Sequence, residues 1–199
     1  MSASELSALL LFCAAMSFSP GPNTTLSTAL AANHGLRRAL RFCLAVPAGW
    51  TLLMLATGLG LGALVTGVPA LRWGVKGLGI AYLLWLAWRL AQASALGQAD
   101  ARRLNVSFMQ GVALQFVNIK AWLNALVISA TWIAVEGELG LRLAQVLPLM
   151  IAYGFASNFC YALVGAALRG WLAQGRRLLW FNRAMAAVLA ATALWMFGA

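Results

Sequence analysis

Two short polar elements interrupt the apolar stretches of this 199-residue chain, and both hold residues able to bind a small charged molecule. The first spans residues 19–25, with the sequence Ser-Pro-Gly-Pro-Asn-Thr-Thr. Because two prolines and a glycine remove backbone donors and steric restraint, a regular helix cannot continue through them. Freed carbonyl groups and the positive end of a following helix would suit a zwitterion that carries a carboxylate. The alternative is a kinked structural helix whose polar side chains bond to their own backbone.

The second polar element spans residues 115–120, Gln-Phe-Val-Asn-Ile-Lys, and places Lys120 about 13 residues into an apolar run. At ~1.5 Å per residue this depth is about 20 Å, near the middle of a membrane. A lysine there costs about 3 kcal/mol and normally has a partner. All four acids lie outside the apolar runs: Glu5, Asp100, Glu136 and Glu138.

Three states of Lys120 are therefore open. The lysine is neutral, it bonds to carbonyl and amide groups, or its counter-ion is the carboxylate of a substrate. We favour the third state, because it explains a cation in an apolar run that holds no acid. The competing interpretation is a misplaced helix boundary, from which Lys120 extends to the membrane surface.

A third group of polar residues lies in the apolar run at 143–167. Tyr153, Ser157, Asn158 and Tyr161 share one broad face of a predicted helix. Hydrogen bonding between helices explains such residues as readily as a place in a binding site does. Both roles stay open for Asn158.

The composition requires elements that can position these residues inside a membrane. Hydrophobic residues make up 63% of the chain and charged residues 9%, against roughly 45–50% and about 25% in soluble domains. A soluble enzyme is excluded, because so few charges cannot solvate a globule of this size. Six apolar runs each suit a membrane-spanning helix of about 20 residues: 6–31, 42–66, 70–91, 107–133, 143–167 and 178–198. The third run is the least regular, since Arg72 and Lys76 interrupt it.

We therefore predict an all-α, polytopic membrane protein with six transmembrane helices, because lipid admits only helices or closed barrels and no alternating strand pattern is visible. Four aromatic residues at run ends are expected at the membrane interface: Trp132, Trp171, Trp180 and Phe181. A polar linker at about 91–105 leaves three spans on either side. The single domain of residues 1–199 would thus consist of two inverted three-helix repeats, about 1–95 and 106–199, each with a broken first helix.

The net charge of +10 is consistent with a membrane protein, because most basic residues lie in the short connections between apolar runs. Ten arginines fall in the first, third and fifth connections, against three basic residues on the other side. The excess of basic residues in cytoplasmic loops places both termini outside the cytoplasm. This arrangement disfavours nucleic acid as a partner, since the bases form no single patch.

The three cysteines, Cys13, Cys43 and Cys160, lie in apolar runs without a C-x-x-C motif. They predict neither a disulfide framework nor a zinc site. A membrane thiol-redox or electron-transfer protein of related fold is the alternative function. It would need two cysteines facing each other across the helix breaks, and the breaks contain none.

Several motifs resemble the LysE/RhtB superfamily of amino-acid exporters over essentially the full length. They are Ser19-Pro20-Gly21-Pro22-Asn23, Gly35-Leu36-Arg37, Gly79-Ile80-Ala81-Tyr82-Leu83 and Asn118-x-Lys120-Ala121-Trp122. Within the family, the motifs at 113–120 and 154–160 look most like the cysteine/O-acetylserine exporter branch. Ile119 stands where relatives carry proline, so a weaker second kink is expected. Asn158 replaces an aspartate of many relatives, which leaves Lys120 as the mid-membrane candidate for proton coupling.

The resemblance implies secondary active efflux of small amino acids or derivatives, either cysteine/O-acetylserine-like or threonine/homoserine-like, across a bacterial inner membrane. The predicted substrate site lies near the midplane between the two halves. Its residues are Pro20, Gly21, Pro22, Asn23, Thr24, Gln115, Asn118, Lys120 and Asn158. No catalytic residue, metal site or cofactor is expected. The expected partners are a small amino-acid substrate and the lipid bilayer, with a coupling proton and a second copy of the chain left open.

Overall fold

The computed structural model describes residues 1–60, 67–93, 105–134 and 137–198, which form helices and no strand. The first half holds α1 (Ala3–Phe18), α2 (Pro22–His34), α3 (Leu36–Gly58) and α5 (Pro69–Ala91). The second half holds α6 (Phe108–Val117), α7 (Ile119–Ile128), the π-helical turn η2 (Ser129–Ile133), α8 (Leu139–Leu172) and α9 (Arg177–Gly198). The all-α prediction is confirmed.

The same order of elements recurs in the two halves, because each begins with a bent helix pair and continues with two longer helices. The bend is 51° between α1 and α2, and 69° between α6 and the α7–η2 segment. Most of the predicted linker at 91–105, and the end of the run at 42–66, lie outside the described residues.

The predicted count of six spans is not confirmed. By length and apolar composition, three helices of the described chain can cross a membrane, namely α3, α8 and α9, and each bent pair adds one span if it crosses as a unit, giving up to five. Helix α5 is not among these candidates. It carries three basic residues: Arg72, Lys76 and Arg89.

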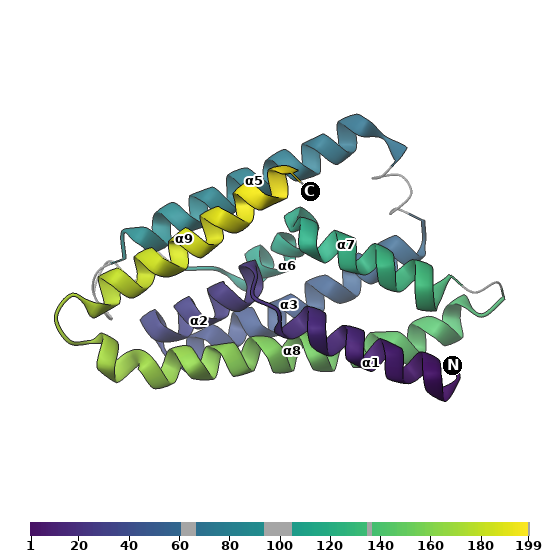
Figure 1. The fold of residues 1–199 in the computed structure, drawn as a ribbon, viewed down its shortest axis with the longest axis horizontal. Helices are drawn as coiled ribbons and strands as arrows, with labels where there is room; N and C mark the ends of the chain where they lie inside the picture. The colour runs from purple at the N-terminus through teal and green to yellow at the C-terminus, as the bar shows by residue number, and fades with distance from the viewer. Residues whose placement is uncertain (61–66, 94–104, 135–136, 199) are drawn as a thin grey trace.

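Helices α2, α3 and α8 pack together, and α1 lies along the first part of α8 (Figure 1). Helices α5 and α9 run side by side and antiparallel along one edge. The close packing of α2 on α8 requires Gly165, because a Cβ there would overlap the carbonyl oxygen of Thr28. Gly79 has the same role where α5 meets the second bend, since its Cβ would overlap the carbonyl oxygen of Val117.

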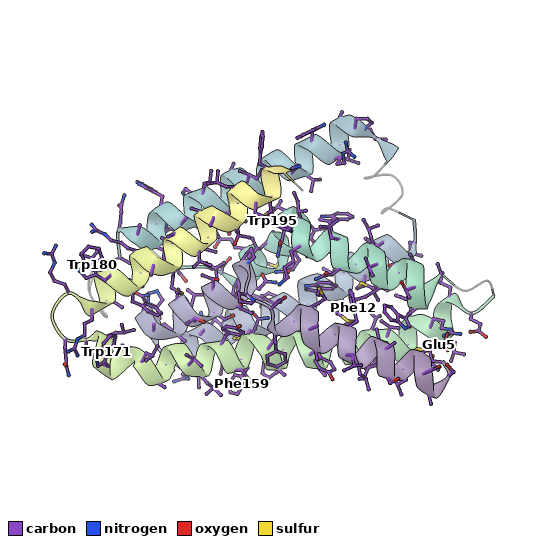
Figure 2. The ribbon with its side chains drawn as sticks, viewed as in Figure 1. Glu5, Phe12, Phe159, Trp171, Trp180 and Trp195 are labelled. Atoms are coloured by element: carbon purple, nitrogen blue, oxygen red, sulfur yellow. The ribbon has the colours of Figure 1, made fainter. Side chains whose placement is uncertain are left out.

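The two ends of the molecule differ in their aromatic residues. Figure 2 shows Trp171 and Trp180 at the end opposite to Glu5. Both rings are exposed, and an arginine guanidinium lies over each of them, at 4.7 Å and 5.4 Å from the ring centroid. Exposed Trp with a basic neighbour suits the interface between lipid and water.

The interface prediction is wrong for Trp132. Only 7% of this residue is exposed, and its ring centroid lies 5.6 Å from that of Phe12. Its indole nitrogen donates a hydrogen bond to the carbonyl oxygen of Glu5 at 3.1 Å. Helix α1 covers this side chain. The position of Trp132 at the end of an apolar run does not indicate that another helix packs on it. Phe181 is also partly covered, by Ala32 and the residues around it.

Candidate substrate-binding site

The first bend is built by the three residues between α1 and α2. Ser19 has an extended backbone, and Gly21 has a fully extended one with φ 179°. The Gly21 N–H donates to Oγ1 of Thr24 at 3.0 Å, and that hydroxyl donates back to the Gly21 carbonyl at 3.1 Å. The first backbone bond of α2 runs from Thr25 N to Gly21 O. The N–H groups of Asn23 and Thr24 therefore have no carbonyl acceptor within α2, and they face the bend.

The second bend is made by Asn118 without a proline. Asn118 has an extended backbone, and its Oδ1 accepts the Lys120 N–H at 3.1 Å, which caps the start of α7. The freed carbonyl of Phe116 accepts the indole N–H of Trp122 at 2.7 Å. This bend is larger than the first, so the expected weaker kink is wrong. Asparagine is among the residues that most favour the start of a helix, so α7 begins here without a proline.

Lys120 reaches from the second bend to the first. Its Nζ lies 2.6 Å from Oγ of Ser19, 3.0 Å from the Ser19 carbonyl oxygen and 3.4 Å from that of Pro20. An ammonium group has three donors, and all three have an acceptor here. Among the described acids, Glu5 and Glu138 instead pair with Arg142. The lysine thus bonds to neutral oxygens of the first bend.

Two predicted amide residues are held by each other. Nδ2 of Asn23 donates to Oε1 of Gln115 at 2.9 Å, and Nε2 of Gln115 donates to Oδ1 of Asn23 at 3.1 Å. Gln115 is fully buried and also donates to the Gly111 carbonyl. It lies behind Asn23 and does not line the cavity described next. Gln115 thus fixes the orientation of Asn23.

Asn158 is fixed in a similar way from α8. Its Oδ1 accepts the hydroxyl of Ser27 at 2.8 Å, and its Nδ2 donates to the Gly154 carbonyl at 2.8 Å. Asn158 is 3% exposed. The sequence left two roles open for Asn158, hydrogen bonding between helices and a place in the site. The structure shows the bond to α2, and Asn158 also borders the cavity.

A cavity of about 580 Å³, its open mouth included, lies where the two bends meet α3 and α8. Most of the predicted site residues line it: Gly21, Pro22, Asn23, Thr24, Asn118, Lys120 and Asn158. Pro20 instead lines an adjoining, more open hollow beside α9.

Several residues that line the cavity were not among the predicted site residues. They come from α1, α3, α7 and α8: Phe12, Cys13, Met16, Trp50, Asn124 and Met150. The signal for Asn124 was present, because it lies one helical turn after Lys120 and so on the same face. The others resemble ordinary apolar helix residues, and only the packing of their helices places them here.

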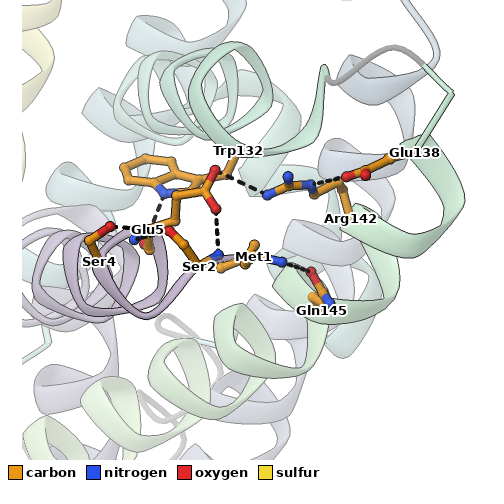
Figure 3. A network of polar contacts seen from close by, with 8 residues as sticks. All are labelled: Met1, Ser2, Ser4, Glu5, Trp132, Glu138, Arg142 and Gln145. Carbon is orange, nitrogen blue, oxygen red and sulfur yellow. Dashed lines mark hydrogen bonds and ion pairs between the residues drawn. The ribbon is translucent and has the colours of Figure 1, made fainter.

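Polar contacts lie toward both ends of the helices that form the cavity. At the end where α1 begins, Arg142 lies 3.3 Å from Oε1 of Glu5 and 2.8 Å from Oε2 of Glu138 (Figure 3). Toward the other end, the side chains of Asn33 and Asn182 exchange hydrogen bonds of 2.7 and 2.9 Å, and both are buried. The first contact joins α1 to α8, and the second joins α2 to α9.

The cysteines give the redox alternative no support. All three are unpaired, with Cys13 and Cys43 buried and Cys160 exposed. The Cys13 thiol lies 3.1 Å from the sulfur of Met150, which is a thioether and cannot form a disulfide. Neither helix bend brings two thiols together.

Apolar helices with two bends that meet at one cavity are typical of a membrane transporter. The chain matches the family model described as "LysE type translocator" over residues 14–199, and it belongs to this family. It is therefore a multi-pass membrane transporter.

Three similar proteins carry the name "Cysteine/O-acetylserine efflux protein". One from Klebsiella pneumoniae subsp. pneumoniae is 32% identical over 93% of this chain and 94% of its own length. One from Salmonella choleraesuis is 31% identical over 87% and 89%, and one from Escherichia coli O1:K1 is 30% identical over 89% and 91%. No solved structure matches the chain significantly.

Proposed function

We propose that this protein exports a small amino acid or a close derivative across the bacterial inner membrane by secondary active transport. The observation that carries the proposal is Lys120, a cation inside the cavity whose bonding partners are all neutral oxygens. A substrate carboxylate is the charge that this site lacks. The names of the relatives support an amino acid as the cargo.

The carboxylate would bind between Lys120 and the start of α2. It would replace the carbonyl oxygen of Pro20, which is the most distant of the three acceptors at 3.4 Å. An ion pair with an additional hydrogen bond is stronger than a bond to a neutral carbonyl. The N–H groups of Asn23 and Thr24 and the positive end of the α2 dipole would add to this attraction.

The substrate side chain would lie against Phe12, Cys13, Met16 and Met150, which line the cavity on the side of α1 and α8. Sulfur-containing and aromatic side chains form a soft, adaptable apolar surface. Such a surface suits the small side chains of cysteine or O-acetylserine better than a long charged one. Threonine or homoserine is the second substrate class that we propose to test.

Transport would proceed by alternating access, with one half of the chain rocking against the other. Breaking the Arg142 contacts would open the cavity to one side of the membrane. Breaking the Asn33–Asn182 pair would open it to the other side. Lys120 is the basic group in the cavity that could exchange a coupling proton. From the distribution of basic residues, both termini would lie in the periplasm.

The test is an efflux assay with labelled cysteine, O-acetylserine, threonine, homoserine and lysine in cells that express the protein. The Lys120→Met variant should lose export of every substrate while its membrane level stays normal. Lys76→Met is the matched control, because Lys76 lies over Trp73 on α5 and outside the cavity. Unchanged export by Lys120→Met would overturn the role of Lys120. Absence of export by the wild-type protein for all five substrates would overturn the proposed function.

A further inference from the structure

Asn124 of α7 lies between two neighbouring hollows. It lines the cavity between the bends, and it also lines the more open hollow beside α9 that includes Trp195. Lys120 lines both hollows too, one turn earlier on the same helix. Side chains four residues apart on a helix have Cβ atoms about 5–6 Å apart. Asn124 and Lys120 thus project from the same face of α7 and border the same two hollows.

The amide of Asn124 differs from the other three asparagine amides of the cavity. Asn23 is bonded to Gln115, Asn118 caps α7, and Asn158 is bonded to α2 and to its own helix. The Asn124 side chain makes no hydrogen bond to any described residue, and it is only partly buried. Its oxygen and both of its N–H donors are therefore available to a bound molecule.

The presence of Asn124 in α7 is not explained by a contribution to the stability of the protein. Asparagine is a poor helix former in a helix interior, and an amide in an apolar setting lowers stability unless it is hydrogen-bonded. Leu123 and Ala125 on either side follow the apolar pattern of α7. A polar residue that weakens the helix and bonds to no described residue has the properties of a ligand contact.

We propose that Asn124 binds the α-ammonium group of the substrate through Oδ1, while Lys120 binds the carboxylate. This inference rests on the proposed function. An α-amino acid carries both groups on one carbon, so two side chains one turn apart can contact them together. Asn124 then determines specificity, because it makes a free α-amino group a requirement for tight binding. An acid of the same shape without that group would use Lys120 alone.

The test compares the wild-type protein with Asn124→Ala in membrane vesicles. Transport of the labelled amino acid is measured alone and in competition with its desamino analogue, the same carboxylic acid without the amino group. Asn124→Ala should raise the KM for the amino acid about 10- to 100-fold, as expected for loss of a hydrogen bond to a charged group. The inhibition constant of the desamino analogue should stay unchanged. Val127→Ala is the control on the same helix, since Val127 is exposed and lines neither hollow.

Two results with Asn124→Ala would overturn the role of Asn124. One is an unchanged KM in Asn124→Ala. The other is an equal loss of affinity for the amino acid and its desamino analogue, which would indicate a structural effect. A second variant, Asn124→Asp, places a carboxylate beside Lys120, and should abolish transport by pairing with it. Active transport by Asn124→Asp with wild-type KM would also contradict the proposal. Failure of the proposed function is distinct from these results, because the wild-type protein would then transport no amino acid.

Discussion

Arg142 at the start of α8 lies 3.3 Å from the carboxylate of Glu5 in the first turn of α1, across 137 residues of sequence. Arg142 is 9% exposed, and it also bonds to Glu138 one turn before it. The backbone of Glu5 accepts the indole N–H of Trp132, so α1, η2 and α8 meet at this point (Figure 3). This contact joins the beginning of the chain to the second half.

Replacement of Arg142 by Met should loosen this end of the molecule. Glu5 and Glu138 would lose their shared cation, and α1 would lose its ion pair with α8 while keeping the hydrogen bond from Trp132 to the Glu5 carbonyl. We expect a lower Tm in detergent and faster reaction of Cys13 with a maleimide in a variant that retains Cys13 as its only cysteine. Cys13 is buried beneath this end and lines the cavity. The control is Arg72→Met, an exposed residue on α5; equal labelling of Cys13 in both variants would show that Arg142 does not restrict access.

Replacement of Gly21 by Ala should impair transport by displacing Lys120. A Cβ on Gly21 would lie 3.3 Å from the lysine Nζ and 3.4 Å from its Cδ, closer than most Cβ contacts. The extended backbone of Gly21 tolerates alanine, so folding should persist. We expect several-fold slower export at a normal expression level. Gly77→Ala on α5 is the matched control, because nothing lies within 4 Å of that position. Wild-type export by Gly21→Ala would argue against a fixed position of Lys120.

Replacement of Gly165 by Ala should destabilise the contact between α2 and α8. The added methyl group would overlap the carbonyl oxygen of Thr28, and backbone cannot rotate away as a side chain can. Forced overpacking costs typically about 1–3 kcal/mol, so the Tm in detergent should fall. Gly170→Ala on the same helix has open space around it and should leave the Tm unchanged or slightly higher. A Tm of Gly165→Ala equal to that of Gly170→Ala would mean that α2 shifts without cost.

The sequence alone determined the features that depend on local chemistry. Apolar composition required a helical membrane protein, and the bend at 20–22 follows from prolines and a glycine that act on their own backbone. The family motifs lie in the same segments, and the family assignment they suggested is confirmed. The absence of an acid from the six apolar runs was visible as well, because it is a matter of counting residues.

Only the tertiary structure decided how these parts meet. The partner of Lys120 is Ser19, 101 residues away in sequence, and Gln115 lies behind Asn23 rather than in the cavity. Trp132 is covered by α1, although its position at the end of a run predicted exposure. Each outcome depends on which helix faces pack together, and that choice arises from contacts over the whole chain, which no single segment encodes.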